Sequence, residues 1–153
     1  MKIVDIIHPS RISTDLESTG KMEVLAELAG LLARESDNDD IEAITAVLVE
    51  RERLATTGVG GGVAIPHGKV EHLKRIVAAI GISHAGVPFD AVDNAPVHIF
   101  VALIAPLNSS GDHLRALARI SRLLKNSYIR DRLFKARDAK ELYALIEEED
   151  GKL

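Results

Sequence analysis

The chain has 153 residues, of which 46% are apolar and 27% are charged, and it carries a formal net charge of −4 with no cysteine. This length and balance are typical of a single globular domain, which we expect to span residues 1–153. The acidic balance and the 3% aromatic content argue against nucleic-acid binding, and the lack of cysteine excludes disulfides and thiolate chemistry.

The first residues do not have the pattern of a targeting or membrane segment. Their apolar run is interrupted by Asp5 and closed by His8 and Pro9. No apolar run in the chain approaches the roughly 20 residues that cross a bilayer. Together with the lack of cysteine, this leads us to expect a soluble protein of the cytoplasm with no direct membrane insertion.

Apolar spacing predicts two helices in the first third of the chain. Over residues 18–35 apolar side chains recur at intervals of three and four, behind a cap expected at Ser18 or Thr19. Over residues 39–52 a similar pattern follows Asp39 and Glu42, which have the spacing of a capping box. The two apolar stripes comprise Met22, Leu25, Leu28, Ala29 and Leu32 in the first helix, and Ile41, Ile44, Val47 and Leu48 in the second.

Three apolar runs then predict extended structure. The glycine-rich residues 58–62 are expected to end regular structure, and the short run 63–65 is stopped by Pro66. Residues 76–83 and 97–106 are rich in β-branched side chains, short, and bounded by Gly, Pro or Asn. These features favour buried central strands.

The last third of the chain again has helical spacing. A helix is expected behind a cap at Ser109 or Ser110, with two shorter ones at about 127–135 and 139–147. The expected buried face of the first comprises Leu114, Leu117, Ala118 and Leu124. Helices at both ends with apolar strands between them predict an α/β fold, a sheet covered by helices.

The segment TTGVGGGVAIPHGKV, residues 56–70, is the most unusual in the chain. Its spacing does not fit a nucleotide P-loop, because five residues separate Gly62 from Gly68 and Val70 stands where a magnesium-binding hydroxyl is needed. A dinucleotide-binding turn is also excluded, because Pro66 would break the helix that must follow. What remains is a glycine-rich loop that leads to a single histidine, His67.

His67 stands in a Pro-His-Gly triplet that can hold its ring in one orientation. A neutral imidazole is a nucleophile near pH 7 and can relay a phosphoryl group, whereas the simpler alternative is a histidine that only satisfies a turn. Transfer of a phosphoryl group needs donors for its oxygens, and Arg51 precedes the loop with a guanidinium suited to that task. The predicted phosphate-binding groups are the Thr57 hydroxyl and the backbone of Gly58, Gly60, Gly62 and Gly68.

His113 is the second candidate, because it lies just inside the helix expected near Ser110. A helix N-terminus disfavours the charged imidazolium, so a histidine there can donate a defined hydrogen bond while neutral. The remaining histidines are assigned to structure or surface. Zinc is weakly supported, because the spacing of five between His67 and His72 does not place two ligands on one helix face.

The sequence resembles the fructose/mannitol-class IIA components of the bacterial phosphoenolpyruvate-dependent phosphotransferase system over nearly its whole length. The resemblance is strongest in RERLATTGVGGGVAIPHGK, residues 51–69, and continues in FDAVDNAPVHIFVALIAP and DHLRALARISRLL, residues 89–106 and 112–124. Among subtypes it is most similar to the nitrogen-regulatory IIA proteins. Gly61 departs from the pattern, which has a larger polar residue there.

The resemblance implies a mixed β-sheet flanked by helices on both faces and a phosphohistidine at His67. It also implies that His113 and Arg51 act beside it, without a metal or cofactor. The implied donor is an HPr-type phosphocarrier protein that docks on an apolar patch, and the implied recipients are a IIB component or regulatory target proteins. Two alternatives remain: a binding protein switched by phosphorylation of His67, and a metal-dependent hydrolase that uses His67, His72 and His113.

Overall fold

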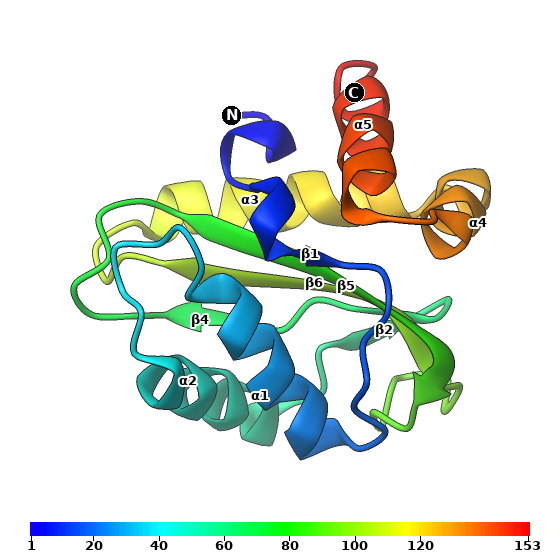
Figure 1. The fold of residues 1–153 in the computed structure, drawn as a ribbon. Helices are drawn as coiled ribbons and strands as arrows, with labels where there is room; N and C mark the ends of the chain where they lie inside the picture. Colours follow the sequence, from blue (N-terminus) through cyan, green and yellow to red (C-terminus); the bar gives the residue numbers. More distant parts are fainter.

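A six-stranded mixed sheet forms the middle layer of the computed structural model, which describes residues 1–153 (Figure 1). The strand order is β1-β5-β6-β3-β2, and β4 also pairs with β6. The long central pair β5 and β6 is antiparallel, whereas β1 runs parallel to β5, and β3 and β4 run parallel to β6. The strands are β1 (Ile12–Ser13), β2 (Gly58–Gly60), β3 (Val63–Ala64), β4 (His67–Lys69), β5 (Val77–Val87) and β6 (Val97–Ala105).

Helices cover both faces of this sheet. Figure 1 shows α1 and α2 against one face and α3, α4 and α5 against the other. Their bounds are α1 (Lys21–Leu32), α2 (Ile41–Leu54), α3 (Ser110–Leu124), α4 (Ser127–Lys135) and α5 (Ala139–Asp150). Two short 3₁₀ turns, η1 (Ile3–Asp5) and η2 (Pro9–Arg11), precede β1. None of the helices combines the length and the apolar composition that crossing a bilayer requires.

The two faces of the sheet bury two separate apolar cores, and β6 contributes to both. Val101 and Leu103 pack under α3, α4 and α5, whereas Ala102 and Ile104 pack against α1 and α2. Successive side chains of a strand point to opposite faces, so a strand buried on both faces is apolar throughout. This explains the apolar run from Ile99 to Ala105 in β6 and confirms the predicted α/β sheet with helices on both faces.

Several predicted boundaries were wrong by a few residues. Helix α1 begins after Gly20, not after Ser18 or Thr19. Asp40 rather than Asp39 caps α2, because its side chain accepts a hydrogen bond from the amide of Ala43 at 3.1 Å. Residues 58–60 form the short strand β2, which pairs with β3 in a glycine hairpin. We define the glycine hairpin as residues 58–64.

The predicted buried face of α3 was partly wrong. Leu114 is 68% exposed and Ala118 is also exposed, while the buried residues are His113, Ala116, Ile120, Leu123 and Leu124. Apolar residues lie on two sides of this helix, so spacing alone did not decide which side meets the sheet. The side that includes His113 is buried, which brings that histidine to the edge of the sheet near β4.

Candidate functional site

His67 is the first residue of β4, a short strand at the edge of the sheet. Its Nδ1 lies 2.7 Å from the carbonyl oxygen of Ile65. A carbonyl oxygen only accepts hydrogen bonds, so Nδ1 carries the proton and donates it. The other ring nitrogen, Nε2, is left with its lone pair free. The ring is half-buried, with a side open to solvent.

The surroundings of His67 favour its neutral form. Burial lowers the pKa of the imidazole most, the hydrogen bond to Ile65 raises it, and the positive charge of Arg51 lowers it further. The carboxylate of Glu52 acts in the opposite direction. The pKa therefore lies below 6.5, the ordinary value for histidine, and the ring is an unprotonated nucleophile near pH 7.

His113 faces His67 from the first turn of α3. The ring centroids are 5.4 Å apart and the rings meet edge to face at 85°. His113 is only 7% exposed, and its buried Nδ1 has no hydrogen-bond partner. An unpaired N–H inside a protein is rarer than an unpaired acceptor, so the geometry favours the tautomer with the proton on Nε2.

Burial also lowers the pKa of His113, and the nearby His67 and Lys69 lower it further. Both rings are therefore neutral at pH 7, and they play complementary parts. His67 presents a lone pair, and His113 retains one N–H that it can donate.

These two histidines open onto a shallow depression of about 430 Å³. Arg51 lies at its wall, where its Nη1 donates to the carbonyl of Ala55 at 2.9 Å. That single bond leaves most of the guanidinium donors unused. The depression is lined by Val47, Glu50, Arg51, Leu54, His67, Gly68, Lys69 and His113.

Thr57 does not belong to this depression. It is 4% exposed, and both its amide and its hydroxyl donate to the carboxylate of Glu52 at 2.7–3.0 Å. Glu52 is itself buried, and Lys21 lies 3.8 Å from one of its oxygens. The Thr57 hydroxyl that we expected to bind phosphate is instead used to close the turn after α2.

The glycine hairpin also lies away from His67, so the structure does not bring the predicted phosphate-binding backbone of Gly58, Gly60 and Gly62 to this histidine. Gly62 accepts hydrogen bonds from the amides of His98 and Ile99, near the start of β6. His67 is paired with Leu103, further along the same strand. Ile99 and Leu103 are four residues apart on β6, and at the rise of about 3.3 Å per residue in a strand the hairpin lies roughly 13 Å from His67. Gly60 instead borders another hollow, beside Arg130.

Gly68 does border the depression, but its packing explains its identity better than phosphate binding does. A Cβ built on Gly68 would lie 2.3 Å from Cγ1 of Val47 on α2. The α2 helix can therefore approach β4 only because this residue has no side chain. Of the predicted residues, the structure brings together His67, His113, Arg51 and Gly68.

Sequence reasoning missed two residues of this region. Lys69 follows His67 by two positions in an extended strand, and this spacing places both side chains on one face. A strand assignment for residues 67–69 would have revealed it. Glu52 offered no such signal, because its contact with Thr57 depends on a turn that the sequence does not specify.

The residues named for a zinc site do not form one. His72 is 88% exposed in its side chain, and its nearest acidic partner is Glu71 at 4.0 Å. No group of three or more His, Cys, Asp or Glu side chains is placed to hold a metal ion. The hydrolase alternative therefore lacks a ligand set.

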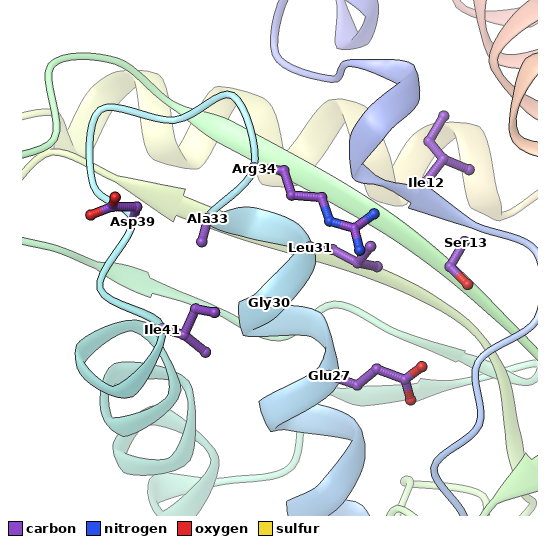
Figure 2. A pocket seen from close by; sticks show the side chains of 9 residues that line it. All are labelled: Ile12, Ser13, Glu27, Gly30, Leu31, Ala33, Arg34, Asp39 and Ile41. Carbon is purple, nitrogen blue, oxygen red and sulfur yellow. The ribbon is translucent and has the colours of Figure 1, made fainter.

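A larger hollow of about 540 Å³ lies elsewhere, between β1, α1 and the start of α2 (Figure 2). Two of its charged side chains are engaged in structural bonds. Glu27 accepts from the amides of Glu17 and Ser18, and Arg34 donates to the carbonyl of Ser10. This hollow contains no histidine, so we place the candidate site at the depression beside His67.

Comparison with known proteins gives one family. Residues 5–149 match the model described as "Phosphoenolpyruvate-dependent sugar phosphotransferase system, EIIA 2". The chain is 38% identical over 146 residues to a nitrogen regulatory protein of Bradyrhizobium diazoefficiens, with 95% of each chain covered. It is 31% identical over 150 residues to the fructose-specific EIIABC component of Bacillus subtilis, of which the match covers 24%.

Solved structures agree with these matches. The nitrogen regulatory protein IIA-Ntr of Neisseria meningitidis superposes with a TM-score of 0.87 at 34% identity, covering 94% of this chain and 98% of that one. The mannitol IIA of Escherichia coli has a TM-score of 0.76 at 17% identity, covering 91% and 97%, and supports the fold alone.

Proposed function

The chain belongs to the EIIA 2 family of the phosphoenolpyruvate-dependent sugar phosphotransferase system, and on that premise we propose that it carries a phosphoryl group on Nε2 of His67. The observation that carries this proposal is the 2.7 Å bond from Nδ1 to Ile65, which leaves Nε2 as the only free ring nitrogen. The free nitrogen belongs to a ring at an open depression that also holds a second neutral histidine and an arginine.

The proposed step exchanges one phosphorus–nitrogen bond for another. The lone pair of His67 Nε2 attacks the phosphorus of a donor phosphohistidine, and the bond from that phosphorus to the donor nitrogen breaks. No proton has to leave His67: Nδ1–H stays bonded to the carbonyl oxygen of Ile65, whose partial negative charge stabilises the positive charge that develops on the ring. Since the bonds made and broken are of the same kind, positioning and charge stabilisation are the main tasks of the protein.

His113 and Arg51 are proposed to stabilise the oxygens of the transferred group. A neutral His113 with its proton on Nε2 donates one hydrogen bond toward the space beside His67. Arg51 supplies a fixed positive charge and a planar set of donors that matches phosphate oxygens.

The donor we propose is an HPr-type phosphocarrier protein. Two large apolar side chains are exposed in this region: Leu54, 77% exposed at the end of α2, lines the depression, and Leu114, 68% exposed, follows His113 in α3. A donor that covers these leucines would also exclude water from the phosphoryl group during transfer.

The first test is phosphoryl labelling. Wild-type protein supplied with phosphoenolpyruvate, enzyme I and an HPr-type donor should gain one acid-labile phosphate, and His67→Ala should gain none. His72→Ala, at an exposed histidine outside the depression, is the matched control and should label normally. Labelling of His67→Ala at the wild-type level would contradict the assignment.

The output of phosphorylation is the second question. The 38% identity to a nitrogen regulatory protein favours a regulatory switch, whereas the likeness to a fructose-specific EIIABC component favours relay to a IIB domain. A switch predicts that His67→Asp and His67→Ala affect binding of the target protein in opposite directions, because only the first adds negative charge. An obligate relay predicts that both variants abolish transfer equally.

The two supporting residues can be tested in the same transfer assay. His113→Ala should slow transfer while leaving His67 able to accept phosphate. Arg51→Lys should also slow it, because a point charge does not replace a planar pair of donors. Wild-type rates in either variant would remove that residue from the proposed site.

A further inference from the structure

Lys69 occupies a position in the depression that the proposed function does not yet use. It is the third residue of β4, two positions after His67. A Cβ at the intervening Gly68 would point at Val47 of α2, on one face of the sheet. Because side chains alternate along a strand, His67 and Lys69 point to the opposite face, where α3 lies.

The ammonium group of Lys69 is held at the start of α3. Its Nζ donates to Oγ of Ser110 at 2.5 Å. Ser110 and His113 are three residues apart on this helix and therefore lie on neighbouring turns of one face. The centroid of the His113 ring is in turn 5.4 Å from that of His67. The ammonium, the donor histidine and the acceptor histidine thus gather around one small volume.

This placement of a cation is electrostatically unfavourable in the unliganded protein. The N-terminus of a helix carries partial positive charge, and Ser109 provides no side-chain cap to its free amides. Lys69 adds a full positive charge at the same point and lowers the pKa of His113. A dianionic phosphoryl group on His67 would turn this repulsion into attraction.

We propose that Lys69 is a further catalytic residue, whose ammonium binds an oxygen of the phosphoryl group while it is transferred to His67. The inference rests on the proposed function. Lys69 stays protonated throughout and makes no covalent bond, so the bonds formed and broken are those already described. Arg51 from α2 and Lys69 from β4 then provide charge from two separate elements of the fold.

The experiment compares Lys69→Met, Lys69→Arg and the control Lys140→Met, which removes an exposed lysine on α5. Transfer from a phosphorylated HPr-type donor is followed over a series of donor concentrations. We expect Lys69→Met to lower the rate at saturating donor about tenfold, Lys69→Arg to retain most of the rate, and Lys140→Met to match the wild type. If Lys69→Met instead raised only the donor concentration needed for half the maximal rate and left the saturating rate unchanged, the proposal would be overturned. Lys69 would then be a docking residue.

A second readout does not depend on transfer. Titration of the His113 ring by NMR should give a higher pKa in Lys69→Met than in the wild type and an unchanged one in Lys140→Met. If wild-type protein is never labelled at His67, the proposed function fails. If it is labelled and Lys69→Met transfers at the wild-type saturating rate with an unchanged His113 pKa, only the inference about Lys69 fails.

Discussion

At the scale of single residues, the two facing histidines make a prediction about pH. The pKa values of His67 and His113 are both lowered, chiefly by burial. As the pH falls below 6.5, the unfolded chain therefore takes up protons before the folded chain does, and the free energy of unfolding decreases. Stability from the neutral rings is present above that pH and is lost as the pH falls toward their folded-state pKa values.

The measurement is a titration of each ring by NMR alongside urea unfolding between pH 7.5 and about 5. We expect both midpoints below 6.5 and a weaker pH dependence of stability in His113→Gln. A midpoint at or above 6.5 for His113 would contradict the influence of burial and of Lys69 described above.

The residues that meet at the depression could be anticipated where local chemistry is specific. The Pro-His-Gly triplet, a histidine at the start of a helix and an arginine before the loop indicated His67, His113 and Arg51 from sequence. The role of Thr57 could not be anticipated, because it depends on the buried carboxylate of Glu52 closing the turn after α2. A hydroxyl residue before a glycine-rich loop gives the same sequence pattern whether it binds a ligand or a neighbouring side chain.

At the scale of elements, the packing of α2 against β4 depends on Gly68. In Gly68→Ala the new methyl group would meet Val47 at 2.3 Å, so the helix must shift away from the strand. We expect a loss of stability of about 1–3 kcal/mol, the usual cost of overpacking, measured by urea unfolding. Adding Val47→Ala should restore much of that loss, because it removes the methyl group that collides.

The matched control is Gly30→Ala, at a glycine of α1 with open space around its Cβ position. Alanine is the better helix former, so this change should leave stability equal or slightly raised. If Gly68→Ala were as stable as the wild type, the close approach of α2 to β4 would not be a requirement of the fold.

Helices and strands were predicted well where apolar spacing was unambiguous. They were predicted poorly where their position depends on which strands pair and in which register. The β-branched runs in β5 and β6 predicted both central strands, since no other element buries such short apolar runs as readily. The glycine hairpin was misplaced because its position depends on register along β6. Register is set by long-range pairing, which no local pattern in residues 58–67 specifies.

At the scale of the whole molecule, one buried carboxylate connects the N-terminal segment to two helices. Asp150 at the end of α5 is fully buried, and its Oδ1 lies 2.6 Å from Nε of Arg119 on α3. Its Oδ2 accepts from the amide of Val4 in η1 at 3.3 Å. We expect Arg119→Met to lower the free energy of unfolding by about 3 kcal/mol, because it leaves a buried charge without its partner.

Chemical denaturation followed by circular dichroism measures this loss. Glu148→Gln is the comparison, because the carboxylate of Glu148 is exposed and its partner Lys152 is also in solvent. Surface pairs of this kind contribute less than about 1 kcal/mol. Equal effects of the two variants would show that the buried pair does not hold these three segments together.

The long strand β6 pairs with the glycine hairpin near its start and with His67 near its end, so the tip of the hairpin lies apart from the proposed phosphorylation site. Gly60, Gly61 and Gly62 all have left-handed backbone, and Gly61 is exposed. A side chain at any of these three glycines would be strained, so the adjacent Val59, 55% exposed on β2, is the suitable attachment point for a fluorescent reporter or an affinity peptide. A protein labelled there would let the proposed donor and target complexes be followed in real time without an added group beside His67.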